Sequence, residues 1–147
     1  MRIYLPLAEE DRPALLAARR ELDLPPGCAA WAVTAEARAD RPGEDIEDLE
    51  YDAVQDAVHV ALQASEPRAR ALVMAADVTD RAIEAAADTG GAYGVRLRTG
   101  ARAVIASFHV TEQDALTAEQ DDTDPALLWF DSSEGPSALV QLDRPGA

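Results

Sequence analysis

Residues 71–76, Ala-Leu-Val-Met-Ala-Ala, decide how the chain is expected to fold, because they form a nearly continuous apolar run. A strand of this kind is buried on both faces, as in the middle of a sheet covered by helices. The segment before it, from about Glu44 to about Ser65, crowds acidic residues into its first turns and is followed by Pro67. Both features are typical of a long helix. The run therefore predicts a central strand with a helix packed against it.

Shorter patterns on both sides of this unit predict further strands and helices. Alternating or apolar runs predict strands at about 2–6, 28–35, 93–97, 103–110 and 127–130. Helical spacing and end signals predict shorter helices at about 12–22, 79–88, 111–119 and 136–142. The order predicts an α/β (or α+β) fold with a mixed β-sheet of about five to six strands covered by helices. We expect one compact domain over residues 1–147, a frayed tail at 143–147, and a hairpin joining 93–97 to 103–110.

The formal net charge is −15. A chain this acidic is repelled by phosphate backbones and anionic lipid headgroups, so we expect no nucleic acid and no membrane as partners. The charge favours solubility, and a basic partner or DNA mimicry are the alternatives. Arg96, Arg98 and Arg102 form a small candidate patch for an anion or an acidic partner, although such residues more often neutralise neighbouring acids.

The cysteine count and the first residues predict a cytosolic protein. The chain has one cysteine, Cys28, which has no partner for an internal disulfide and is expected to be a small buried thiol. The sequence starts with a strand-like run rather than a signal peptide, and no apolar stretch reaches the roughly 18 residues of a membrane span. All 13 basic residues are arginine, which suits a GC-rich genome.

Short motifs spread over almost the whole chain resemble those of a known family. They are Tyr4-Leu5-Pro6, Leu49-Glu50-Tyr51, Ala75-Ala76-Asp77-Val78, His109-Val110 and Leu127-Leu128-Trp129-Phe130. Taken together they resemble an actinobacterial family of small proteins classed as a domain of unknown function. The resemblance implies a cytosolic actinobacterial origin and carries no activity, cofactor or partner with it.

Glu50 is the first candidate for chemistry, because it interrupts an apolar face. On a helical wheel it falls inside the stripe formed by Ile46, Leu49 and Ala53. A carboxylate on a buried face is costly unless it is paired or protonated. The structural interpretation is a Glu bonded to an Arg, a backbone amide or a Tyr hydroxyl. The functional interpretation is a general acid/base or a ligand-binding carboxylate.

Asp77 and His109 are the other two catalytic candidates, because each follows or ends a predicted strand. In open α/β sheets the carboxyl ends of strands line the ligand crevice. Asp77 is equally suited to cap the following helix, and His109 to a packed, hydrogen-bonded role. Trp31, Trp129 and Phe130 lie on apolar strands and are expected in the core.

Asp52, Asp56 and His59 share one face of the long predicted helix, as a metal-binding set would. That face lies opposite the apolar stripe, so a solvated acidic face is the alternative. We treat these residues as weak metal candidates and expect no metal site and no cofactor.

Two functions remain open. The first is a non-enzymatic cytosolic interaction or regulatory module that binds a protein partner or a second copy through a free strand edge or an exposed apolar patch. The last strand and the hairpin are the candidate surfaces. The alternative is a small enzyme or small-ligand binder that uses acid/base residues near Glu50, Asp77 and His109.

Overall fold

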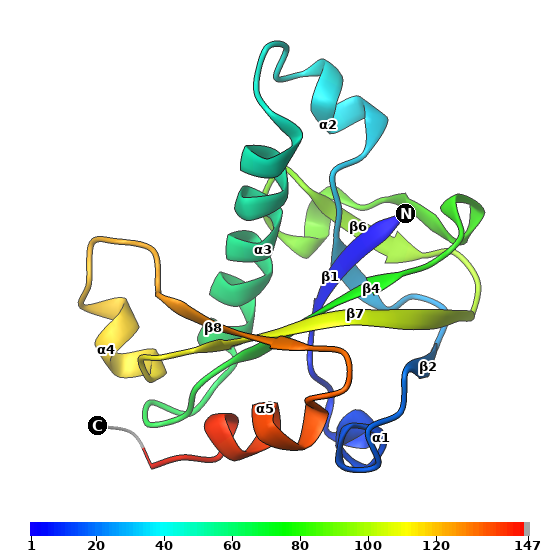
Figure 1. Ribbon diagram of the computed structural model, residues 1–147. Helices are drawn as coiled ribbons and strands as arrows, with labels where there is room; N and C mark the ends of the chain where they lie inside the picture. Colours follow the sequence, from blue (N-terminus) through cyan, green and yellow to red (C-terminus); the bar gives the residue numbers. More distant parts are fainter. Residues whose placement is uncertain (146–147) are drawn as a thin grey trace.

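The computed structural model describes residues 1–145 and contains one open, curved sheet of eight strands in that range (Figure 1). The strands are β1 (Arg2–Pro6), β2 (Glu21–Leu24), β3 (Ala29–Trp31), β4 (Leu72–Asp77), β5 (Ile83–Ala85), β6 (Gly94–Leu97), β7 (Ala101–Thr111) and β8 (Leu127–Asp131). Their order is β2-β7-β4-β1-β3-β6-β5, and β8 also pairs with β7. Every pairing is antiparallel. The fold is therefore α+β, and the prediction of a mixed sheet of five to six strands was wrong in both respects.

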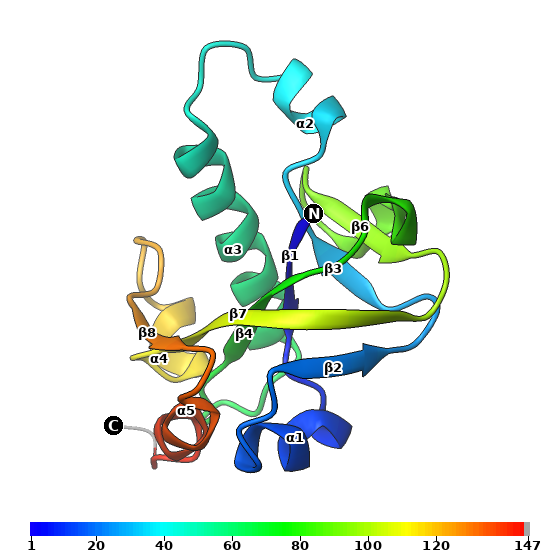
Figure 2. The same cartoon turned by 45° about the vertical axis from the view of Figure 1, so that its right-hand side comes forward.

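Helices cover both faces of this sheet. They are α1 (Arg12–Leu16), α2 (Ala35–Ala39), α3 (Ile46–Gln63), α4 (Ala115–Glu119) and α5 (Gly135–Leu142), with single 3₁₀ turns η1 (Glu9–Asp11), η2 (Asp80–Ala82) and η3 (Ala87–Thr89). The long helix α3 packs on β1, β3 and β4. Helices α1 and α5 contact each other on the opposite face, where α5 packs on β7 and β8 (Figure 2).

The sheet separates two hydrophobic cores. Alternation along β4 sends Leu72 and Met74 to the core under α1 and α5, and Val73 and Ala75 to the core under α3. The run at residues 71–76 is thus apolar throughout because both faces of β4 are buried, as predicted. Within residues 1–145, no helix is both long and apolar enough to span a membrane.

Helix α3 fits closely because small residues face large ones. Ala53 and Ala57 are fully buried, and they belong to the same core as Tyr4 and Trp31. The helix begins after Asp45, whose backbone is extended, and it carries acidic residues in its first turn. Alanine on the helix thus lets aromatic side chains of the sheet supply the volume of this core.

Two segments predicted to be helical are partly strand. The predicted helix at about 12–22 ends at Leu16, and β2 follows, because Leu22 and Leu24 alternate with exposed acids and bury one face. Residues 80–89 form η2, β5 and η3 rather than one helix. The predicted hairpin was also wrong: β6 pairs with β3 and β5, while β7 pairs with β2, β4 and β8.

The strand β7 carries a bulge opposite β4. Ala75 pairs with Ser107 and Ala76 pairs with Ile105, so Ala106 is the extra residue. Ile105 and Phe108 both belong to the core under α1 and α5. Ala106 and Ser107 therefore both face the α3 side, so Ser107 lies on the same face as His109.

The segment after α5 makes defined contacts as far as it is described. Arg12 forms an ion pair with Asp143, and the Arg70 guanidinium donates to the carbonyl of Arg144 at 2.8 Å. Residues 146–147 of the predicted frayed tail lie outside the described residues. The predicted domain limits stay a prediction.

Candidate functional site

Glu50 lies at the edge of α3, beside the sheet, and is half buried. The hydroxyl of Tyr4, on β1, donates a hydrogen bond of 2.9 Å to its carboxylate. Tyr4 itself is buried, and burial together with this carboxylate raises the pKa of its phenol. A Tyr hydroxyl is one of the three partners predicted for Glu50 from the sequence.

Asp77 ends β4 and is bound by Arg2, its cross-strand neighbour on β1. Arg2 Nε lies 2.8 Å from Asp77 Oδ1, and Nη2 lies 3.1 Å from Oδ2, so the contact is bidentate. The Arg2 guanidinium holds the pKa of this carboxyl below its usual value. The carboxylate is thus ion-paired, and it does not cap the short η2 turn, whose N-cap residue is Thr79.

His109 lies on β7 and shares a hydrogen bond with Ser107. Ser107 Oγ and His109 Nε2 are 2.9 Å apart. Burial of the imidazole, helped by the positive charge of Arg2, lowers the pKa of His109 below its usual 6.5. The lowered pKa favours the neutral imidazole, and with the ring proton on Nδ1 its Nε2 accepts from the Ser107 hydroxyl.

The three catalytic candidates lie on the same face of the sheet, but each is held by its own partner. Asp77 and His109 alternate with residues of the other core, so both point to the α3 side. Two hollows on the described part of the structure are lined by other residues and not by Glu50, Asp77 or His109. The fold thus brings these residues to one surface without enclosing them in either hollow.

The larger of the two hollows is an acidic groove between α3, α4 and the loop that leads into β8. It has a volume of about 890 Å³, and its lining includes Leu62 and Leu116 together with five acidic residues. These are Asp56, Glu119, Asp121, Asp122 and Asp124. No arginine lines this groove. We call it the acidic groove below.

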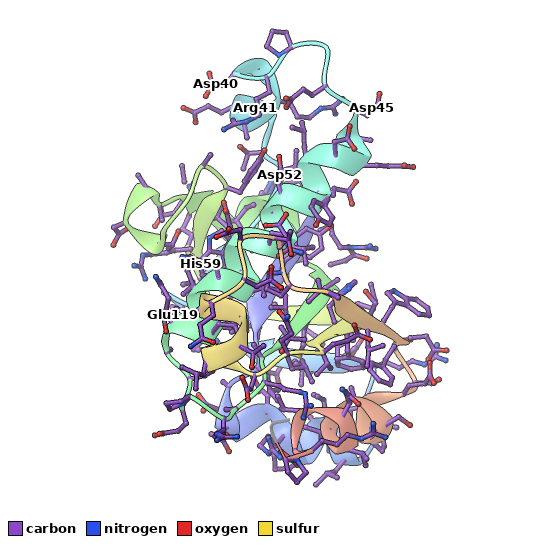
Figure 3. All side chains as sticks on the ribbon, turned by 90° about the vertical axis from the view of Figure 1, so that its left-hand side faces the viewer. Asp40, Arg41, Asp45, Asp52, His59 and Glu119 are labelled. Atoms are coloured by element: carbon purple, nitrogen blue, oxygen red, sulfur yellow. The ribbon has the colours of Figure 1, made fainter. Side chains whose placement is uncertain are left out.

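Two of the three candidate metal residues, Asp56 and His59, line the wall of this groove. Figure 3 shows Asp52 and His59 along α3, with Glu119 of α4 close to His59. Asp56 and His59 line the groove, and burial and the charge of Asp52 raise the pKa of Asp56. Among residues 1–145, no three His, Cys, Asp or Glu side chains are grouped as a metal ion would require.

The arginines of the candidate patch are each engaged by acids. Arg96 pairs with Asp88, Arg98 with Glu84, and Arg102 with Glu21 and Asp23. These contacts match the expectation that the arginines neutralise neighbouring acids. Cys28 is half buried, and burial raises the pKa of its thiol.

The α3 side of β7 and β8 forms an open face, because the strands against which α3 mainly packs are β1, β3 and β4. We define the open face by Val104, His109, Trp129 and Asp131, with the buried Ser107 beneath them. Trp129 is 62% exposed and Val104 is 47% exposed. The prediction that Trp129 lies in the core was wrong, whereas Trp31 is 1% exposed, as predicted.

The outer edge of β8 has backbone groups that point away from β7. The amide of Glu112 donates to the carbonyl of Ala126, which fixes the phase of the β7–β8 ladder. In an antiparallel sheet, hydrogen-bonded and non-hydrogen-bonded residue pairs alternate along the ladder. Leu127 and Trp129 belong to non-hydrogen-bonded pairs with β7. Their N–H and C=O groups therefore point away from β7. No hydrogen bond from another segment of the described chain reaches them. The edge of β8 is thus free to pair with an added strand.

Sequence reasoning missed Tyr4, Arg2 and Ser107 as partners of the candidate residues. Tyr4 and Arg2 alternate along the first strand, which was the only signal that they share a face. Ser107 gave no signal, because its place beside His109 on the α3 side depends on the bulge in β7.

Comparison with known proteins gives a family and no activity. Residues 1–139 match the profile of a family described as "Family of unknown function (DUF6912)". No curated protein and no solved structure shows a significant match to the chain.

Proposed function

The chain belongs to this family of unknown function, and we propose that it acts as a non-enzymatic cytosolic interaction module. The proposed docking surface is the open face together with the free edge of β8. The partner is a protein of net positive charge.

The exposure of Trp129 is the observation that carries this proposal. Large apolar side chains on a free edge strand attract other chains, and proteins usually protect such edges with charge, proline or a covering segment. The segment Leu127-Leu128-Trp129-Phe130 has neither charge nor proline. Aromatic residues are also enriched at the centres of protein interfaces. A partner that covers this edge accounts for both features.

The expected sign of the partner's net charge follows from the net charge of this chain. A net charge of −15 repels a second copy and attracts a basic protein. The open face itself includes Asp131 on β8, and the acidic groove lies at the start of that strand. A basic protein partner is therefore favoured over a homo-oligomer.

The test places a photoreactive benzoylphenylalanine at position 129 of the chain in its native host. The control carries the same group at position 16, because Leu16 is 64% exposed and lies on α1, away from the open face. We expect a covalent adduct with a basic protein at position 129 that is absent at position 16. No adduct at 129, or an adduct made only of two copies of the chain, would contradict the proposal.

Purified partner then checks that Trp129 is buried on binding. The chain has two tryptophans, and Trp31 is already buried. We expect the partner to shift tryptophan emission to shorter wavelength with the wild-type chain. The same partner should cause no shift with the Trp129→Phe variant, because the remaining tryptophan, Trp31, is already buried in the free chain.

A second candidate function, a small hydrolase, is favoured by the contact between Ser107 and His109. A Ser hydroxyl at 2.9 Å from a neutral imidazole is arranged as a nucleophile and its general base. In such a step Ser107 Oγ would attack an acyl carbon while its proton moves to His109 Nε2. The proton would then pass to the leaving group, and water would release the acyl chain. Of the three catalytic candidates, the hydrolase uses His109 alone. Glu50 and Asp77 have no role in this step.

A fluorophosphonate probe separates the two candidate functions. The hydrolase predicts covalent labelling of the wild-type chain that is lost in Ser107→Ala and strongly slowed in His109→Gln. A Ser133→Ala variant, which changes an exposed serine outside the open face, should label like wild type. Absence of labelling at Ser107 would refute the hydrolase and leave the interaction module untouched.

Origin and compartment are proposals of the same kind. Arginine supplies every basic side chain, and alanine is abundant, which supports an actinobacterial genome rich in GC. The single cysteine supports a reducing compartment such as the cytosol.

A further inference from the structure

We infer that the partner presents an extended, basic segment that adds to the sheet as a strand beside β8 and places its cationic side chains in the acidic groove. This inference rests on the proposed function and names the chemistry of the partner.

The backbone geometry favours an added strand. Leu127 and Trp129 each offer one N–H and one carbonyl on the side away from β7. The next outward amide, that of Asp131, is already bonded to the Glu134 carboxylate at 3.0 Å. The free part of the edge is therefore short and ends at Asp131, so an added strand must extend in the other direction, past Leu127.

Beyond Leu127 the added strand meets the acidic groove. Pro125 lines the groove and lies two positions before Leu127 in the chain. At about 3.3 Å per residue, an extended segment covers that distance in about two residues. The wall of the groove at Pro125 therefore lies close to the end of β8 past which an added strand must extend.

The groove suits a long side chain with a cationic end. Leu62 and Leu116 provide apolar surface for the methylene groups of Arg or Lys, and five acidic residues provide the opposite charge. Asp121 is fixed in this position: the Thr123 backbone amide, the Gln113 amide and the Thr123 hydroxyl hold its pKa at about 2. Asp121 is therefore ionised throughout the physiological range.

The same charges argue against a second copy of this chain. A second β8 would bring a second acidic groove beside the first, and each chain carries a net charge of −15. Like charges placed next to each other across an interface are costly. The occupant is therefore a different protein with a basic strand.

The first experiment measures binding of a fluorescein-labelled peptide of alternating arginine and valine, about ten residues long, by fluorescence anisotropy. We expect saturable binding to the wild-type chain and none for the matching peptide of glutamate and valine. Trp129→Ala should weaken binding about tenfold or more, because the exposed indole packs beside the added strand. No binding of the arginine peptide, or equal binding to Trp129→Ala, overturns the inference.

Methylation of alternate peptide nitrogens tests whether the peptide binds as a strand. Only one edge of an added strand faces β8, so only one alternate set of amides donates to it. We expect about tenfold weaker binding when one set is methylated and nearly unchanged binding when the other is methylated. Equal effects of the two sets overturn strand addition.

A matched pair of double variants tests the groove. Glu119→Gln with Asp122→Asn removes two exposed charges from the groove, and Glu36→Gln with Asp40→Asn removes two exposed charges on and beside α2. Figure 1 places α2 at the far end of α3 from α4. We expect the groove pair to weaken binding several-fold more than the α2 pair. Equal losses overturn the role of the groove, because net charge alone then accounts for binding.

Failure of this inference and failure of the proposed function are distinguishable. An adduct with a basic protein at position 129, together with no specific binding of the arginine peptide, means that the partner docks in another way. Absence of any crosslinked adduct at position 129 contradicts the proposed function itself.

Discussion

Replacing Tyr4 with Phe tests the polar link between α3 and the sheet most directly. The substitution removes one hydroxyl and leaves the ring packed in the core under α3, so it creates almost no cavity. The lost hydrogen bond of 2.9 Å ends on a carboxylate, and bonds to charged groups contribute about 1.5–3 kcal/mol. Glu50 is half buried and recovers some hydration. We therefore expect a loss of about 1–2 kcal/mol in the free energy of unfolding.

Urea denaturation at pH 7, followed by circular dichroism, measures this loss. For a chain of this size it corresponds to a fall in Tm of roughly 2–8 °C. Tyr51→Phe is the matched control, because the exposed Tyr51 hydroxyl donates to Asp124 at 3.2 Å. Its removal should cost less than about 0.5 kcal/mol. A double-mutant cycle with Glu50→Gln should give a coupling energy of about 1 kcal/mol.

The same variant has a signature at alkaline pH. Burial and the Glu50 carboxylate raise the pKa of Tyr4 above its usual 10.0 in the folded chain. Above pH 10 the unfolded chain loses this proton while the folded chain keeps it, so stability falls as pH rises from that value. The Tyr4→Phe variant should lack the part of the stability loss above pH 10 that comes from Tyr4. If Tyr4→Phe is no more destabilising than Tyr51→Phe and loses stability above pH 10 as steeply as wild type, the argument for a buried polar link is refuted.

Three further predictions concern stability. Glu50→Gln should destabilise the chain more than any other acid-to-amide change in α3, and equal melting temperatures across that series would contradict the reasoning. Burial and Arg2 lower the pKa of His109 below 6.5, so stability should fall as pH drops below that value, because the unfolded chain binds the proton first. His109→Gln should flatten this acid-side loss in a pH series of urea midpoints. A Cβ at Gly135 would lie 2.6 Å from the Leu15 carbonyl oxygen, so Gly135→Ala should cost about 1–3 kcal/mol, and an unchanged Tm would show that α5 can move away from α1.

Part of the fold could be predicted because some signals are local. The apolar run at residues 71–76 predicts β4, and the crowded acids and Pro67 bound α3 within about two residues at each end. The strand at 127–130 was also recognised from its composition. Two other segments, predicted to be helical, are partly strand. The short strands β2 and β5 contain only four and three residues, so neither gives enough alternation to compete with the helical spacing around it.

The candidate site was less predictable, because its members come from separate helices and strands. Glu50 was found by its place in an apolar stripe, and its partner type was among those expected. The pairing of Asp77 with Arg2 depends on the antiparallel register of β1 and β4, which pattern alone does not fix. The contact of Ser107 with His109 depends on one extra residue in β7.

The net charge, the central strand, the long helix and the unusual position of Glu50 could all be predicted, because each depends on residue types or on spacing within one segment. The strand order, the polar pairs and the exposure of Trp129 instead depend on contacts between segments that are distant in the chain. An apolar strand has the same sequence pattern whether or not a helix covers it. Helix α3 packs on β1, β3 and β4, and that placement, made by contacts far apart in the chain, leaves the indole of Trp129 in solvent.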